Sequence, residues 1–341
     1  MRLFRQFSPR AIGIAAAVIT VIMWTSFILV SRAAADPTRG ATLGPFDLAM
    51  ARILGASTVL LPLGRWLARS DRARGVGSSS LFGFSPLSLR MTLFIGPCAG
   101  WLYALLAYGG FVFAPASHAS VLLPGSLPLW TALMAALVLR TRITPARAVG
   151  LALIVAGDAL VGGRSLLHAF DGGQVWIGDL LFMTAAFSWA IYSVQVRKYA
   201  LEAVRATAAL TAFAFFTYVP VYGTLLLLHW VPGRFLTAPI GDILVQMVFQ
   251  GLGSVVVSGV TFTRMIQHFG PVRSTMITAV VPALSALGAV FVLGEPMYWN
   301  LVAGLALVTL GILFGVRMLP AVPVPASGPG TPAVAAGRHG G

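Results

Sequence analysis

Ten apolar stretches, each long enough to cross a membrane as a helix, follow one another along the chain with short polar connections between them. They lie near residues 11–31, 46–67, 91–113, 117–139, 146–163, 179–196, 206–229, 242–263, 274–293 and 299–317. The hydrocarbon core of a bilayer is about 30 Å thick, and a helix needs about 20 predominantly apolar residues to cross it. The sequence therefore predicts an all-α integral membrane protein with ten transmembrane helices.

The composition leaves no room for a sizeable soluble domain. Hydrophobic residues fill 58% of the 341 positions and charged residues only 9%, whereas soluble domains carry about 25% charged residues.

The first apolar stretch has one other interpretation, because arginines precede it and AAADP at 33–37 resembles a signal-peptide cleavage site. Its apolar run from Ala11 to Val30 is longer than the core of a typical signal peptide, which favours a retained helix.

The excess of basic residues predicts how the helices are oriented. The net charge of +14 would suggest nucleic-acid binding in a soluble protein. With the N-terminus inside, 18 of the 23 basic residues fall on the cytoplasmic side, and the opposite side receives only Arg32, Arg39, Arg164 and Arg234. This asymmetry follows the positive-inside rule. We therefore expect a multi-pass protein of the inner (cytoplasmic) membrane, with both termini cytoplasmic and no nucleic-acid partner.

The chain also contains an internal repeat. Residues 127–157 align without a gap with residues 281–311, and eleven of the 31 pairs are identical, including Pro128/Pro282, Gly150/Gly304 and Gly157/Gly311. The first helices of each half match more weakly, through Trp24/Trp189 and Arg32/Arg197. Five spans per repeat is an odd number, so the second copy enters the membrane from the opposite face. Inverted five-helix repeats of this kind are typical of transporters that hold substrate where the halves meet.

These segments resemble the drug/metabolite transporter superfamily, and specifically its EamA-type transporters. The resemblance extends from about 11 to 317 and is most specific at LGEP (293–296), with WTSFILVSR at 24–32 and GDLLFMTAAFSWAIYSVQVRK at 178–198. In the first half, Thr141 stands where the resemblance leads us to expect the acid of LGEP. The resemblance implies ten helices, a central cavity and, commonly, export of amino acids, other metabolites or drugs.

The repeat and the resemblance together predict five segments. They are a cytoplasmic N-terminus (1–10), a first EamA-like repeat (11–163), an external linker (164–178), a second EamA-like repeat (179–317) and a disordered cytoplasmic tail (318–341).

Polar residues recur at every fourth position of the eighth span, at Asp242, Gln246, Gln250, Ser254 and Ser258. This spacing makes a slowly winding polar stripe on a helix. We expect Gln246 and Gln250 to line a substrate cavity. The alternative is hydrogen bonding between helices, which holds membrane helices together without contacting substrate.

Two charged residues within spans are further candidates. Arg52 is costly to bury and could bind a substrate carboxylate, or it could bond backbone carbonyls or extend toward the interface. Asp158 in the fifth span could carry a coupling proton, or it could be hydrated at the outer helix end.

Aromatic residues could line the same cavity. Trp24, Trp101, Tyr103 and Trp189 lie within spans, and Tyr192 belongs to a polar stripe on the sixth span; packing is the alternative for all of them. Pro124, Pro128 and Pro282 predict interrupted helices in corresponding places of the two halves, a pattern that points to a transporter site.

Together these features predict a secondary transporter that works by alternating access. We expect an exporter of a small amino-acid-like, neutral, zwitterionic or partly apolar solute, in the lipid bilayer, with a coupling proton and a homodimer as further partners. The sequence has no HExxH, GxSxG or Gly-rich phosphate loop and one cysteine, Cys98, so we expect no enzyme, no cofactor and no metal. A membrane-embedded enzyme or a channel is the alternative.

Overall fold

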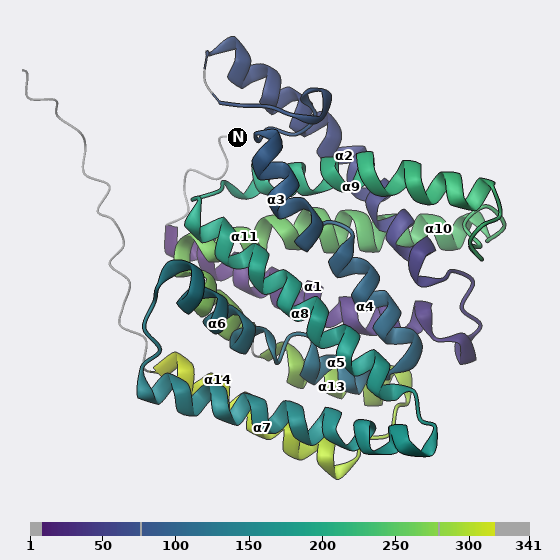
Figure 1. The fold of residues 1–341 in the computed structure, drawn as a ribbon, viewed down its shortest axis with the longest axis vertical. Helices are drawn as coiled ribbons and strands as arrows, with labels where there is room; N and C mark the ends of the chain where they lie inside the picture. Colours follow the sequence, from purple (N-terminus) through teal and green to yellow (C-terminus); the bar gives the residue numbers. More distant parts are fainter. Residues whose placement is uncertain (1–8, 76, 279, 318–341) are drawn as a thin grey trace, which may run out of the picture.

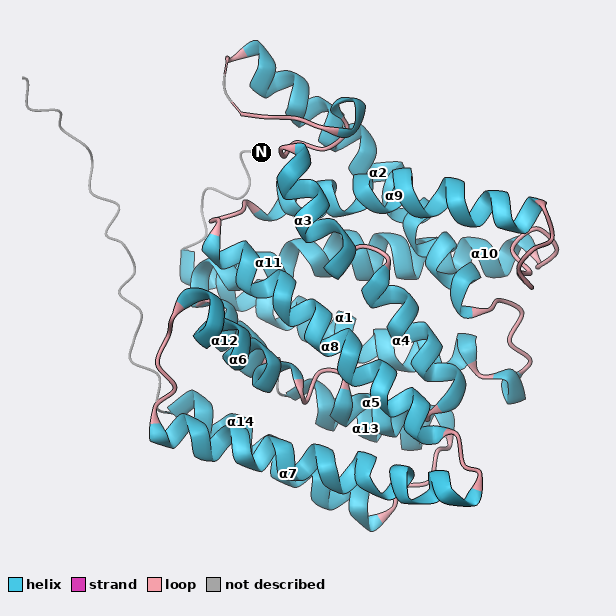
Figure 2. Cartoon of the chain, in the orientation of Figure 1, coloured by secondary structure: helices cyan, strands magenta, loops and turns pink. Residues whose placement is uncertain are grey.

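A computed structural model describes residues 9–75, 77–278 and 280–317 of the chain. Within these residues the regular elements are helices, drawn in cyan in Figure 2. The first half contains α1 (Pro9–Ala35), α2 (Pro45–Ala73), α3 (Leu89–Ala99), α4 (Leu102–Phe113), α5 (Ala116–Leu122), α6 (Leu127–Leu139) and α7 (Pro145–Leu167). The second contains α8 (Val175–Lys198), α9 (Ala203–Leu227), α10 (Ile240–Gln246), the π-helix η5 (Met247–Val257), α11 (Ser258–Phe269), α12 (Pro271–Ile277), α13 (Val280–Leu293) and α14 (Trp299–Arg317).

The helices confirm the prediction of a ten-helix membrane fold. In the described part of the chain, nine helical segments are long and apolar enough to cross a membrane, and Trp299–Phe314 forms a shorter apolar helix. Four of these spans consist of consecutive helices: α3 is followed by α4, α5 by α6, α12 by α13, and α10 by η5 and α11. Most of the N-terminus predicted at 1–10 and all of the tail predicted at 318–341 lie outside the described residues.

The contact between α7 and α14 shows the inverted relation of the two repeats. These two helices lie side by side along one edge of the bundle and make the most extensive contact between any two described elements (Figure 1). A Cβ added to Gly157 would lie 2.7 Å from the carbonyl oxygen of Gly304. A Cβ added to Gly311 would overlap the carbonyl oxygen of Gly150. The repeat equates Gly150 with Gly304 and Gly157 with Gly311, so exchanging the halves converts one contact into the other. That exchange is what a two-fold relation between the repeats requires.

The other helix contacts follow the same exchange. α1 packs on α11 and α13 of the second half, and its counterpart α8 packs on α4 and α6 of the first half. α2 packs on both its own counterpart α9 and the π-helix η5. Because each half contributes to every one of these contacts, the bundle forms one body in which the halves are interleaved (Figure 1).

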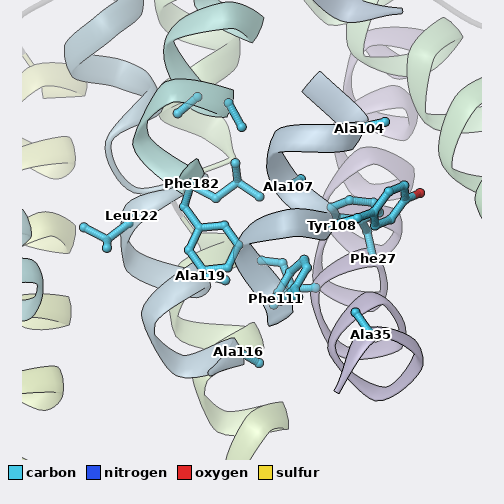
Figure 3. Close-up of a cluster of buried hydrophobic side chains, with 14 of the residues drawn as sticks. Phe27, Ala35, Ala104, Ala107, Tyr108, Phe111, Ala116, Ala119, Leu122 and Phe182 are labelled. Carbon is cyan, nitrogen blue, oxygen red and sulfur yellow. The ribbon is translucent and has the colours of Figure 1, made fainter. Parts of the chain in front are cut away.

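Small residues allow the core helices to approach one another closely. Figure 3 shows one cluster, where Phe27 of α1, Tyr108 and Phe111 of α4, and Phe182 of α8 meet. The rings of Phe111 and Phe182 are 4.9 Å apart, and alanines of α4 and α5 fill the space between the larger side chains. Since lipid tails are as apolar as these side chains, the close packing itself holds the helices together.

The connection between the halves is shorter than the linker predicted at 164–178. Helix α7 continues to Leu167 and α8 begins at Val175, with a short 3₁₀ turn, η4 (His168–Asp171), between them. Apolar windows predict the part of a helix inside the bilayer, and helices often continue beyond it by a turn.

Candidate substrate site

Two small cavities lie on either side of the Trp189 side chain, and each is lined from both halves of the chain. The first has a volume of about 30 Å³ and includes Arg52, Tyr192, Thr211 and Ser254 in its wall. The second has about 20 Å³ and is bordered by Trp24, Phe27, Tyr103, Pro124, Val281 and their neighbours. A cavity needs about 10–15 Å³ to hold one water molecule. Each cavity therefore has room for only a few waters.

Arg52 is buried in the wall of the first cavity. Its guanidinium donates a hydrogen bond of 2.8 Å to Ser254 Oγ and lies 5.7 Å from the centroid of the Phe27 ring. Two glycines where α2 crosses η5, Gly55 and Gly251, bring the backbones into direct contact one turn from Arg52. In the described part of the chain, no carboxylate lies within ion-pair distance of Arg52. Its charge therefore borders the cavity without a counter-ion among the described residues.

A connected cluster of aromatic rings contributes to the walls of both cavities. The ring of Trp189 lies 4.8 Å from that of Tyr103, 5.4 Å from that of Tyr192 and 6.1 Å from that of Trp24. Phe262 completes the group at 4.7 Å from Trp24. Trp24, Tyr103, Trp189 and Tyr192 thus come together as the sequence suggested, although they also pack on one another.

Two polar atoms of the cavity wall have no protein partner. The indole Nε1 of Trp189 and the hydroxyl of Thr211 are buried without a hydrogen-bond partner among the described residues. Buried polar groups of this kind are costly unless water or a ligand satisfies them. They offer hydrogen bonds to whatever occupies the first cavity.

The polar stripe of the eighth span mainly joins the two halves. Ser254 bonds Arg52, and Ser258 accepts a hydrogen bond of 2.8 Å from Trp24 Nε1. Gln250 accepts a bond of 3.0 Å from the Tyr108 hydroxyl and donates one of 3.1 Å to Ser31. The stripe passes through η5, whose backbone bonds skip one more residue than those of an α-helix and widen its turns. These wider turns reduce how far a four-residue repeat winds around the helix. Gln250, Ser254 and Ser258 therefore all reach helices of the first half.

Gln246 and Trp101 lie outside both small cavities. Gln246 is buried, and its Oε1 has no partner among the described residues. Trp101 donates a hydrogen bond of 3.1 Å to Thr217 and its ring lies 6.4 Å from that of Tyr218. The structure thus places Trp101, between α3 and α4, against α9.

Interrupted helices border the cavities in both halves. Gly100, between α3 and α4, lines the first cavity, while Leu123 and Pro124, between α5 and α6, line the second. Val281 of α13 lies opposite them in the wall of the second cavity. Backbone that leaves helical geometry at membrane depth is tolerated where it borders a cavity or is buried in protein.

This architecture has clear relatives. A model of the EamA-like transporter family matches the chain over residues 11–163 and 176–317. The chain belongs to the EamA-like transporter family. It is therefore a multi-pass membrane protein of a transporter family with a ten-helix fold.

Individual relatives of this EamA-like transporter are distant. It is 28% identical over 201 residues to "Uncharacterized transporter" of Archaeoglobus fulgidus, covering 58% of this chain and 61% of the relative. It is 24% identical over 198 residues to "Uncharacterized transporter YyaM" of Bacillus subtilis, covering 56% and 62%. The alignment thus spans about three fifths of the length of each of these two relatives.

A longer alignment, 290 residues at 27% identity, joins it to "Probable terminal-alkyne amino-acid exporter" of Streptantibioticus cattleyicolor and covers 82% of this chain and 85% of the relative. A solved structure titled "Crystal structure of protein" has the same fold, with a TM-score of 0.59 at 21% identity over 91% of this chain and 99% of that chain.

The most specific motif of the EamA-like transporter, LGEP, lies at one end of the bundle. Gly294 ends α13 with a positive φ of 65°, which turns the chain and directs Glu295 inward. The Glu295 carboxylate accepts hydrogen bonds of 3.0 and 3.1 Å from the backbone N–H groups of Ala116 and Ser117, at the start of α5. It also accepts one of 3.2 Å from Arg32 Nε. We call these residues the Glu295 network.

Neighbouring charges extend the Glu295 network. Arg32 also pairs with Asp36 at 2.9 Å, and Arg39 pairs with the same carboxylate at 3.3 Å. Burial disfavours the charged form of Asp36, but hydrogen bonds from Thr38 and the two arginines outweigh burial and lower the pKa of Asp36.

A second ionic group joins helices at the opposite end. Asp71, near the end of α2, pairs with Arg205 at the start of α9. Glu202 accepts hydrogen bonds of 3.2 and 3.0 Å from the backbone N–H groups of Val204 and Arg205, and it lies 3.9 Å from Arg264 of α11. We call these residues the Asp71 network. The two networks therefore join helices at opposite ends of the bundle.

Other predicted and unpredicted residues complete the description of the site. Asp158 lies away from the two small cavities, in a pocket between α6, α7 and α8. Phe27 borders the second cavity and Phe262 packs on Trp24, but neither residue was predicted. Phe27 follows Trp24 by three residues, which places both on one helix face, and this spacing could have predicted Phe27.

In the described residues, no group of three or more His, Cys, Asp or Glu side chains could hold a metal ion.

Proposed function

We propose that this EamA-like transporter is a secondary transporter, and specifically an exporter of a small amino-acid-like solute. The observation that carries this proposal is the Arg52 guanidinium, which borders a cavity without a carboxylate partner among the described residues. A substrate carboxylate would supply the missing negative charge, and guanidinium groups bind carboxylates with two parallel hydrogen bonds.

The rest of the wall suits the remainder of such a solute. The indole Nε1 of Trp189 and the hydroxyl of Thr211 offer hydrogen bonds to polar groups. The rings of Trp24, Tyr103 and Tyr192 offer contact to an apolar side chain. The name of the Streptantibioticus relative, an amino-acid exporter, supports the same substrate class.

The small cavities and the two ionic networks support alternating access as the proposed mechanism. Because about 30 Å³ holds only a few waters, substrate enters only if the halves move and Trp189 shifts. Opening the Glu295 network would expose the site at one end, and opening the Asp71 network would expose it at the other. Proton coupling at Asp158 and a homodimer stay predictions.

Counterflow in proteoliposomes tests both the transport activity and the role of Arg52. A panel of amino acids is compared with the matching amino alcohols, which lack the carboxylate. We expect Arg52→Gln, at equal membrane abundance, to lower amino-acid exchange at least tenfold, and Arg52→Lys to retain part of it because the charge remains. Ser254→Ala is the matched control, since it removes the hydrogen-bond partner of Arg52 and keeps the charge.

Unchanged exchange in both Arg52 variants would assign Arg52 to structure. Flux that saturates and is stimulated from the opposite side identifies a carrier. A channel shows no such stimulation, and a membrane-embedded enzyme would alter the solute rather than exchange it.

The topology we propose has both termini in the cytoplasm of a cell whose inner membrane holds the protein. Reporters fused before Ala11 and after Arg317 test it. We expect activity from reporters that work in the cytoplasm and none from those that require export, because 18 of the 23 basic residues then lie inside. Export-dependent activity at both ends would refute this orientation.

A further inference from the structure

A pocket of about 450 Å³ lies between α6, α7 and α8, separate from the two small cavities. It is lined by Leu129 and Trp130 of α6, by Val155, Asp158, Ala159, Gly162 and Gly163 of α7, and by Trp176, Asp179, Leu180 and Met183 of α8. None of these residues borders either small cavity. Its volume falls within the range of about 300–1,000 Å³ that is typical of small-molecule sites.

The pocket contains a buried carboxylate without a partner. Asp158 is only 5% exposed, and neither of its carboxyl oxygens has a hydrogen-bond partner in the described part of the chain. The indole Nε1 of Trp130, in the same wall, is likewise buried and unsatisfied. An isolated carboxylate is among the most costly groups to bury, so two unsatisfied polar groups on one pocket point to a missing ligand.

The charge of the pocket favours a cation. Neither Arg nor Lys is among the described residues that line it. Asp179 is a second carboxylate of the same wall, and one of its oxygens lies 2.9 Å from Nδ1 of His118. Among the described residues, the wall therefore carries two carboxylates and no Arg or Lys, although the chain as a whole has a net charge of +14.

The remaining wall favours an apolar body and entry from the lipid. Val155 and Leu180, on the rim, are 48% and 53% exposed on helices that span the membrane. Trp130 and Trp176 provide ring faces, which attract ammonium groups. A ligand with one ammonium group and an apolar body would satisfy the carboxylate and fill the space.

We propose that this pocket binds amphipathic amines that reach it through the bilayer, with the ammonium group on Asp158. A lipid with an amine headgroup offers the same ammonium, but it also carries a phosphate, which the carboxylates of Asp158 and Asp179 would repel. The inference does not depend on transport through the central site.

Binding of 4-phenylbutylamine to the purified full chain tests the proposal. The protein is placed in phosphatidylcholine nanodiscs, and binding is measured by calorimetry and by the shift in melting temperature. The neutral analogue 4-phenylbutanol is the matched ligand control. We expect the amine to bind at least tenfold more tightly than the alcohol and to raise the melting temperature.

Three variants test in turn whether amine binding depends on the charge of Asp158, on free space in the pocket, and on the central site. Asp158→Asn should lower amine affinity at least tenfold without loss of melting temperature, since the amide replaces an unsatisfied carboxylate. Ala159→Phe should block amine binding by filling the pocket while keeping Asp158. Arg52→Gln should leave amine binding unchanged, which distinguishes this pocket from the central site.

Several results would overturn the proposal. These are absence of binding to the unmodified protein, equal affinity for amine and alcohol, unchanged affinity in Asp158→Asn, or loss of binding in Arg52→Gln. The same binding measurement in nanodiscs that contain phosphatidylethanolamine shows whether the ammonium group comes from a free amine or from a lipid headgroup. Unchanged amine affinity there supports a free amine, whereas competition by the lipid assigns the pocket to the headgroup and refutes a free amine as its occupant.

Discussion

At the scale of single residues, the two glutamines of the polar stripe differ in their surroundings although the sequence presents them alike. Gln250 is fully buried and bridges Tyr108 of α4 and Ser31 of α1. Gln246 lies one step earlier in the repeat, and its Oε1 has no partner among the described residues. Spacing along one helix predicts a shared face, but the partners come from other helices and are not encoded in that spacing.

This difference makes Gln250→Leu and Gln246→Leu a matched pair. Gln250→Leu should lower the melting temperature, because it removes two interhelical bonds worth about 0.6 kcal/mol each and leaves the Tyr108 hydroxyl unsatisfied. Gln246→Leu should leave stability unchanged or raise it. Thermal unfolding and transport per folded molecule are measured on both. Loss of specific transport without loss of stability in Gln250→Leu would instead support direct contact with substrate.

At the scale of elements, glycines decide how closely helices approach. Gly157 and Gly163 lie on the same helix, α7, and have opposite surroundings. A Cβ on Gly157 would lie 2.7 Å from both the carbonyl oxygen of Gly304 and a methyl group of Val308, whereas one on Gly163 would meet no atom within 4 Å.

Gly157→Ala should therefore destabilise the protein by about 1–3 kcal/mol, the usual cost of overpacking. Gly163→Ala is the control and should be neutral or stabilising by up to about 1 kcal/mol, because alanine favours the helix. The measurement is the free energy of unfolding in detergent. Equal effects of the two substitutions would mean that the α7–α14 contact tolerates separation.

The elements also show which parts of the fold were readable in advance. Apolar windows located all ten spans, and the prolines at 124, 128 and 282 marked helices that the structure interrupts. The π-helix η5 was not predicted, since π and α hydrogen bonding depend on packing around the helix rather than on residue type. The ionic partner of Glu295 was missed for a similar reason: Arg32 lies in the other half and only the folded chain brings the two together.

At the scale of the whole molecule, the Glu295 and Asp71 networks lie at opposite ends of the bundle. In the alternating access that we propose, each network opens while the other stays formed. Arg205→Gln removes the cation that joins Asp71 to α9. The population open at that end should then increase.

Thiol accessibility measures this shift in population. Cys98 is the only cysteine in the sequence, so Cys98→Ser gives a background without thiols. A cysteine introduced by Thr211→Cys then reports on the first cavity, where Thr211 is buried. We expect Arg205→Gln to raise its rate of modification by a charged thiol reagent several-fold. An unchanged rate would show that the Asp71 network does not hold the cavity closed.

The glycine contact between α7 and α14 has a consequence for how the chain could be assembled. Each of these helices ends its own half, and their contact is the most extensive in the described bundle. The chain between Leu167 and Val175 is a short turn and contributes no residue to either small cavity. Two fragments cut in this turn and produced together in one cell would keep the surface by which they recognise each other. Covalent continuity there serves to deliver both halves in equal number, and the helices themselves specify how they join.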